Sequence, residues 1–144
     1  MTNPMISPSD MKVGIDPDVH KIGVAVWDGD DFARLQTMTF FELFEYLCFH
    51  VNDIDVVVIE AGWLNKKANW HGGNHRSSQR IAGNVGRNHE TGRKIVEMCE
   101  YLELEHTLVQ PRRSKFSAEL FERTTGHTVK NQDIIDAAML VYQQ

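Results

Sequence analysis

The first forty residues carry a pattern of short β-rich runs. Residues 12–16 (KVGID) and 22–27 (IGVAVW) are rich in apolar and β-branched side chains and are separated by a polar segment. An Asp-Gly pair follows the second run and favours a tight hairpin turn, after which residues 32–39 can return as a third strand. The pattern therefore predicts an antiparallel meander of three strands.

Helical periodicity and apolar runs alternate over the rest of the chain. Residues 40–51 repeat apolar side chains at helical spacing, and residues 55–59 (DVVVI) form the continuous apolar run of a strand buried on both faces. The remaining predicted elements are a helix from about 78 to 104 that Gly83, Gly86 and Gly92 are expected to bend or interrupt, a strand over 106–109, a helix from Ser114 or Ser117 to Gly126, and a helix from Asn131 to Tyr142. This order of elements predicts an α/β fold.

Length and composition place these elements in one soluble domain. The chain has 144 residues, of which 42% are hydrophobic and 24% charged, and it is too short for a TIM barrel or a two-domain kinase. We expect residues 1–10 to form a flexible tail and residues 11–144 a single domain. No stretch approaches the roughly 18 consecutive apolar residues of a membrane helix, and the first residues lack a signal-peptide pattern, so we expect a cytoplasmic protein with no membrane partner. Cys48 and Cys99 lie in apolar patterns without paired spacing, which predicts buried free thiols.

Basic residues are concentrated in one segment of an otherwise acidic chain. The net charge is −5, yet seven basic residues and one acidic residue lie between Lys66 and Lys94. Arg112, Arg113 and Lys115 form a second basic cluster. A phosphate backbone would bind such segments, and a solvated loop and helix face would also account for them.

Carboxylates stand at the ends of several predicted elements. Asp16 ends the first strand, Glu60 ends the buried strand, and Asp133 and Asp136 lie three residues apart on the last helix, and therefore on one face. If the two strands run parallel and adjacent, three or four carboxylates converge into a site suited to Mg²⁺ or Mn²⁺. Each acid also has a simpler interpretation: an Asp-Pro turn, a solvated strand end, or first-turn acids that the helix dipole favours.

Three segments that contain these acids match a known pattern together. GIDPDVHKIGVAVWDG, VVVIEAGW and NQDIIDAAMLV resemble, in order and spacing, the three acidic motifs of the RuvC-type Holliday junction resolvases in the ribonuclease H-like superfamily. The family usually has glycine after the proline of the first motif, where this chain has Asp18. The resemblance covers nearly the whole chain and implies a mixed five-stranded sheet, with a three-strand antiparallel meander and two parallel strands, flanked by helices.

The resemblance also implies an activity and a set of functional residues. It implies a metal-dependent endonuclease that hydrolyses branched DNA with two Mg²⁺ ions about 3.5–4 Å apart, which Mn²⁺ can replace. Asp16 would bridge the ions between Glu60 and Asp136, and Asp133 would add a ligand or position the water. The family's pattern further implies a catalytic basic residue at Lys115 and a base-stacking aromatic residue at Trp63, for which a core tryptophan is the alternative. The remaining expected DNA-binding residues are Lys66, Lys67, Arg76, Arg80, Arg112 and Arg113.

The resemblance implies a homodimer, because two symmetric cuts in a four-way junction need two sites related by a two-fold axis. The helix from residue 78 to 104 is the family's usual dimer element. Two alternatives remain open: a nuclease of the ribosomal-RNA-maturation branch of the superfamily, and a protein that binds branched nucleic acid without cutting it. The first alternative is less favoured, because that branch lacks the strand-end glutamate and carries an acidic motif where this chain has QPRRSK.

Overall fold

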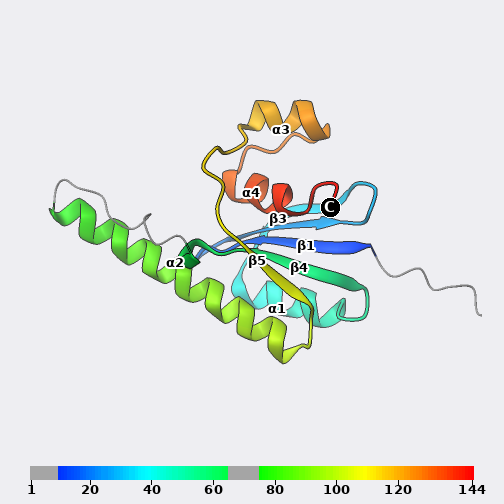
Figure 1. The fold of residues 1–144 in the computed structure, drawn as a ribbon, viewed down its shortest axis with the longest axis horizontal. Coiled ribbons are helices and arrows are strands. Elements are labelled where there is room, and N and C mark those ends of the chain that lie inside the picture. The colour runs from blue at the N-terminus through cyan, green and yellow to red at the C-terminus, as the bar shows by residue number, and fades with distance from the viewer. Residues whose placement is uncertain (1–9, 65–74) are drawn as a thin grey trace, which may run out of the picture.

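A five-stranded mixed sheet forms the centre of the protein (Figure 1). The computed structural model describes residues 10–64 and 75–144, apart from the side chains of residues 75–82 and 84. The strands, in chain order, are β1 (Met11–Asp16), β2 (Ile22–Trp27), β3 (Phe32–Met38), β4 (Ile54–Glu60) and β5 (His106–Val109). They lie in the order β3-β2-β1-β4-β5, with β1 to β3 antiparallel and with β4 parallel to both β1 and β5. The predicted meander and the predicted pair of parallel strands are both confirmed.

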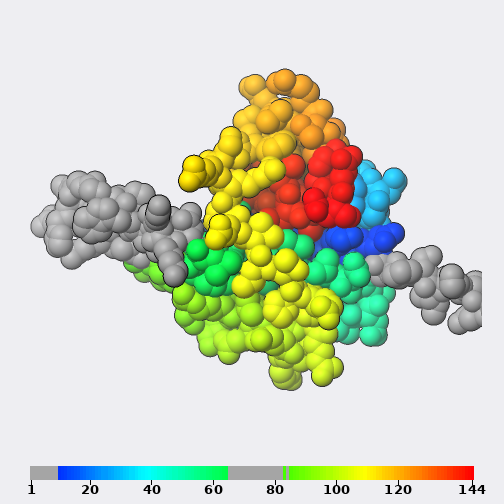
Figure 2. Space-filling model, in the orientation of Figure 1, coloured from blue at the N-terminus to red at the C-terminus, as the bar shows by residue number. Residues whose placement is uncertain are grey.

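Helices cover both faces of this sheet. They are α1 (Phe40–Phe49), α2 (His75–Tyr101), α3 (Ala118–Thr125) and α4 (Gln132–Val141), with a short 3₁₀ turn, η1 (Gly62–Leu64), after β4. Helices α1 and α2 lie on one face, and α4 lies on the other with α3 outside it, so the molecule has a layered outline (Figures 1 and 2). The apolar side chains accordingly form two cores, one on each face of the sheet. None of the helices that the structure describes has the length and apolar character needed to cross a membrane.

Local capping explains why the helices begin and end where they do. The Thr39 hydroxyl accepts the Glu42 backbone N–H while the Glu42 carboxylate accepts the Thr39 backbone N–H, a reciprocal capping box at the start of α1. Ser117 and Asn131 cap α3 and α4 in the same position, and Gly126 ends α3 with a φ of 82°. The predicted boundaries of the last two helices are therefore confirmed.

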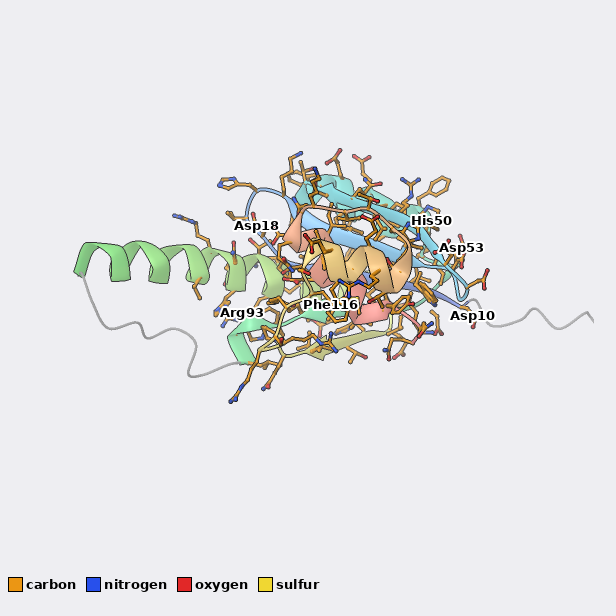
Figure 3. The ribbon with its side chains drawn as sticks, turned by 90° about the horizontal axis from the view of Figure 1, so that it is seen from above. Asp10, Asp18, His50, Asp53, Arg93 and Phe116 are labelled. Carbon is orange, nitrogen blue, oxygen red and sulfur yellow. The ribbon has the colours of Figure 1, made fainter. Side chains whose placement is uncertain are left out.

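Two expectations about the helices are wrong. Helix α2 is continuous over 27 residues despite its glycines. A Cβ at Gly83 or Gly86 would meet none of the described residues within 4 Å, whereas a Cβ at Gly92 would meet the Trp63 ring, so Gly92 serves tertiary packing. The predicted burial of both thiols holds for Cys99 alone, because Cys48 lies on the exposed side of α1. In Figure 3 the first turns of α2 extend beyond the sheet.

Helix α4 approaches the sheet closely at two glycines. A Cβ on Gly14 of β1 would lie 2.1 Å from the Ala137 carbonyl oxygen, and a Cβ on Gly23 of β2 would lie 2.2 Å from the Asp133 carbonyl oxygen. Any side chain at either position would therefore push the helix away from the sheet. These two contacts determine the height of α4 above β1 and β2.

Candidate active site

Three carboxylates converge at one edge of the sheet. Asp16 is the last residue of β1 and Glu60 the last of β4, and the two strands are parallel neighbours paired through Ile15 and Ile59. Asp136 reaches the same place from α4. One carboxylate oxygen from each of Asp16, Glu60 and Asp136 lies within 4.8 Å of the other two. The convergence expected from the sequence is thus present for these three acids.

Asp133 lies beside this cluster without belonging to it. Its backbone rests over Gly23, which is the antiparallel partner of Asp16. Burial and the nearby Asp18 raise the pKa of Asp133, against the opposite effect of a side-chain hydrogen bond with Asp16. A role for Asp133 as an additional ligand or as a residue that positions water stays a prediction.

Burial and the repulsion of neighbouring acids raise the pKa values of Asp16 and Glu60. The pKa of Asp16 rises from 3.8 to about 9, first because its side chain is buried and then because Glu60, Asp133 and Asp136 are near. Burial also raises the pKa of Glu60, against the effect of Lys115. Buried carboxylates that are all ionised repel one another and destabilise the folded state, so a bound cation would stabilise this cluster.

Lys115 supplies one positive charge to the cluster. Its Nζ lies 3.1 Å from Asp136 Oδ2 and 3.6 Å from Glu60 Oε2. Burial opposes its charge, but Glu60, Asp136 and Asp16 outweigh burial and raise the pKa of the Lys115 ammonium. A second contact orients Asp136, because Gln132 Nε2 donates to Asp136 Oδ1 at 2.8 Å.

The donor set fits a hard divalent cation. All three ligand groups are carboxylates, and Mg²⁺ and Mn²⁺ prefer oxygen ligands. The donors come from two strand ends and one helix, and these elements are fixed by sheet pairing and by the glycine contacts of α4. One ammonium against three carboxylates leaves the cluster with negative charge that an ion of this class would balance.

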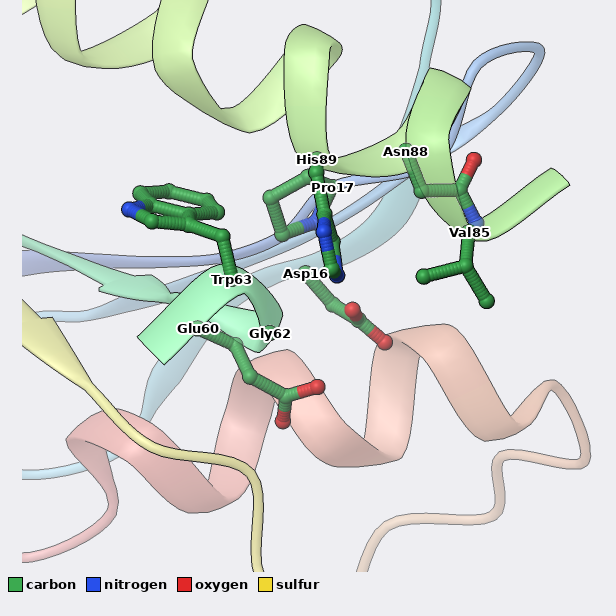
Figure 4. A pocket seen from close by; sticks show the side chains of 8 residues that line it. All are labelled: Asp16, Pro17, Glu60, Gly62, Trp63, Val85, Asn88 and His89. Atoms are coloured by element: carbon green, nitrogen blue, oxygen red, sulfur yellow. The ribbon is translucent and has the colours of Figure 1, made fainter. Parts of the chain in front are cut away.

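A pocket of about 170 Å³ opens beside Asp16 and Glu60 on the α2 side (Figure 4). Trp63 and Gly62 of η1, Pro17 after β1, and Val85, Asn88 and His89 of α2 complete its lining. Asn88 Oδ1 accepts the Val19 backbone N–H at 3.0 Å, which ties the β1–β2 turn to α2. Asp18 closes that same turn by accepting the backbone N–H groups of His20 and Lys21, so aspartate in place of the usual glycine still gives a tight connection.

Trp63 both packs against the core and lines the pocket, so it has features of a core tryptophan and of a base-stacking residue. Its ring is partly buried against the core of the α1 and α2 face, and it fits over Gly92, where a Cβ would lie 2.3 Å from Trp63 Cζ3. The same ring lines the pocket, and the Arg93 guanidinium carbon lies 5.7 Å from its centroid. Contact with a base therefore stays a prediction for a side chain that also packs.

The expected DNA-binding residues are only partly described. Lys66 and Lys67 lie outside the described residues, and Arg76 and Arg80 belong to α2 but their side chains lie outside them as well. Arg112 and Arg113 are exposed beside Lys115, between β5 and α3. These two arginines thus share a segment with Lys115, which contacts Glu60 and Asp136.

Sequence analysis missed several residues around the cluster. His89 and Asn88 reach the pocket because α2 crosses the end of β4, and no spacing in the sequence signals that crossing. Phe116 follows Lys115 directly and lines a second pocket with Glu60 and Asp136. Its position next to Lys115, the predicted catalytic lysine, is the feature of the sequence that could have indicated a place for Phe116 near the site.

Comparison with known proteins relates this architecture to solved structures. No protein-family model matches the chain, and no curated protein matches it in sequence. Its structure is similar to Thermus thermophilus RuvC in complex with a Holliday junction substrate, with a TM-score of 0.58, 12% identity, and coverage of 91% of this chain and 89% of that one. A separate structure of Thermus thermophilus RuvC gives a TM-score of 0.54 and 11% identity over 91% of this chain and 90% of the other. The protein therefore has the ribonuclease H-like fold in the form found in RuvC.

Proposed function

We propose that the protein is a divalent-metal-dependent endonuclease that hydrolyses phosphodiesters in branched DNA, in the manner of a Holliday junction resolvase. The observation that carries this proposal is the convergence of Asp16, Glu60 and Asp136 within 4.8 Å at the edge of a RuvC-like sheet. The related Thermus thermophilus protein is described in complex with a Holliday junction substrate, which supports the same substrate class here.

The carboxylates would hold two Mg²⁺ ions, or Mn²⁺ in their place. Bound ions of this kind would help to form hydroxide from water and would stabilise the 3′-oxygen as it departs. The products would carry a 3′-hydroxyl and a 5′-phosphate. Asp16, which has Glu60, Asp133 and Asp136 as acidic neighbours, would bridge the ions. Glu60 and Asp136 would each add a ligand, and Asp133 would hold a further ligand position or a water molecule.

Lys115 would act on the phosphate side of the reaction. Its ammonium already contacts Asp136 and Glu60, so it lies where a scissile phosphate would approach the carboxylates. Once cations neutralise those acids, the ammonium can turn to a phosphate oxygen and stabilise the charge that develops there. Arg112 and Arg113 would extend this contact along the backbone, together with Lys66, Lys67, Arg76 and Arg80.

Selection of branched DNA needs groups that distinguish it from a linear duplex. Trp63 lines the pocket beside the carboxylates, where an unpaired base at the crossover could stack on it. Two symmetric cuts require two sites, so we propose a homodimer formed through α2.

The test is a cleavage assay with four labelled substrates: a four-way junction, a linear duplex, single-stranded DNA and an RNA hairpin. The proposal predicts paired, symmetric cuts in the junction with Mg²⁺ or Mn²⁺ and none with a chelator. Preferential cutting of the RNA hairpin would favour the ribosomal-RNA-maturation activity instead. Junction binding without cutting under any divalent cation would identify a binding protein.

A further inference from the structure

Two aromatic rings, each with an arginine over it, lie on opposite sides of the carboxylate cluster. On the α2 side, the Arg93 guanidinium carbon lies 5.7 Å from the Trp63 ring centroid. On the α4 side, the Arg112 guanidinium carbon lies 5.4 Å from the Phe116 ring centroid. Glu60 lines the pocket next to each pair, so the cluster stands between two similar arrangements.

The α4-side pocket is the larger of these two. Its volume is about 240 Å³, and four partly buried apolar side chains line it: Val109, Phe116, Met139 and Leu140. Glu60 and Asp136 of the carboxylate cluster also line this pocket, together with Lys115, Arg112 and Gln144. Apolar side chains and the groups that would hold a scissile phosphate therefore share one pocket.

The chemistry of this pocket restricts what it can bind. A purely apolar ligand would make no use of the charged groups at Arg112 and Lys115, and a simple anion would gain nothing from the four apolar side chains. A flat heterocycle joined to a phosphate satisfies both parts. Nucleobases stack on aromatic rings and on arginine guanidinium planes, and the phosphate attached to such a base would lie at the cation-loaded cluster.

The course of a DNA strand through the site also favours a nucleobase as the ligand of this pocket. A strand whose phosphate lies at Asp16, Glu60 and Asp136 has one nucleoside before that phosphate and one after it. Trp63 lies on one side of the cluster and Phe116 on the other. A single strand that crosses the cluster can therefore place one base against each pair.

We propose that the Arg112–Phe116 pair is a second base-stacking platform, which binds a nucleobase flanking the scissile phosphate on the side opposite Trp63. This inference rests on the proposed nuclease function and adds a contact that would make cleavage sensitive to the base at that position. It assigns Phe116 to substrate binding and Arg112 to stacking as well as to the phosphate backbone.

The test uses 2-aminopurine, whose fluorescence falls when it stacks, placed on either side of a cut that has first been mapped in a four-way junction. Binding is measured with Asp16→Asn, so that the strand stays intact, alone and combined with Phe116→Ala, Phe116→Leu or Phe116→Tyr. We expect quenching at the position that Phe116 contacts, loss of that quenching in the alanine and leucine variants, and its retention in the tyrosine variant. Affinity for the junction should fall by about tenfold without the ring.

Leucine keeps much of the apolar volume, so it guards against loss of folding, and thermal melting checks each variant. Phe49→Ala removes an aromatic ring that is 83% exposed on α1 and should change neither fluorescence nor affinity. Unchanged quenching and affinity in a folded Phe116→Leu variant would overturn the second platform while leaving the nuclease function in place. A wild-type protein that neither binds nor cuts the junction would instead overturn the proposed function, and the platform with it.

Discussion

Helices α4 and α2 flank the same carboxylate cluster, but they are attached to the sheet in different ways. Helix α4 meets β1 and β2 backbone to backbone at Gly14 and Gly23, and it delivers Asp133 and Asp136. Helix α2 meets the sheet through buried side chains in its second half, among them Ile95 and Cys99. The difference indicates that the proposed metal ligands tolerate little displacement, whereas groups on the α2 side depend on side-chain packing.

The largest expected effect comes from Asp16, the carboxylate proposed to bridge the metal ions. Asp16→Asn should reduce the single-turnover cleavage rate of a four-way junction by at least about 10³-fold, because each lost 1.4 kcal/mol of transition-state stabilisation costs tenfold and metal ions supply several kcal/mol. Junction binding should persist, since the change adds no negative charge beside the phosphate backbone. Cleavage by Asp16→Asn at the wild-type rate would place the active site elsewhere.

The next effect tests how closely α4 must approach the sheet. Gly23→Ala would place a Cβ 2.2 Å from the Asp133 carbonyl oxygen, so the helix must shift. We expect a loss of about 1–3 kcal/mol in the free energy of unfolding and about a 100-fold fall in cleavage rate, because misplacement by about 1 Å has costs of that size. The matched control is Gly83→Ala in α2, where a Cβ meets no described residue within 4 Å. The control should lose neither stability nor cleavage, and equal effects of both substitutions would refute the comparison.

Packing on the α2 side gives a smaller, mixed effect. Trp63→Ala removes a partly buried ring and should lower the free energy of unfolding by about 3 kcal/mol. It should also weaken junction binding by about 1–3 kcal/mol while duplex binding changes little. Melting curves and two binding titrations separate these effects. A large loss of stability with junction selectivity intact would make Trp63 a packing residue alone.

The last effect concerns pH and the metal-free protein. The pKa of Asp16 in the folded chain is about 9, above its usual 3.8, so the folded state holds a proton that the unfolded state releases. This contribution to stability is complete below about pH 4 and is lost as the pH rises to about 9. Melting temperatures without metal should therefore fall over this range, and Mg²⁺ should raise them most at the alkaline end.

Two substitutions check the origin of that pH dependence. Asp16→Asn should make the metal-free slope shallower, because the asparagine side chain does not titrate, while Glu60 and Asp133, whose pKa values are also raised, keep contributions of the same sign. Asp30→Asn changes an exposed acid in the β2–β3 turn, at the far end of β2 from Asp16, and should leave the slope as it is. A slope that Asp16→Asn leaves unchanged would assign the effect to other groups.

The positions of Asp16 and Glu60 could be predicted because both end apolar runs, and neighbouring parallel strands end at the same edge of a sheet. Asp136 followed from helical spacing. The contacts of His89, Phe116 and Gly92 could not be predicted in this way, because they depend on where α2 and α4 cross the strand ends. Gly92 is an example. Its low helix propensity alone predicts a weakened helix, and only the fold shows that the Trp63 ring packs against it.

The most direct test of the proposed metal centre is an anomalous difference map from crystals grown with Mn²⁺. The proposal predicts peaks within ligand distance of Asp16, Glu60 and Asp136, with Lys115 Nζ moved away from its 3.1 Å contact with Asp136. Peaks at other residues only, with Lys115 still bound to Asp136 and Glu60, would contradict the assignment of this cluster as the catalytic metal site.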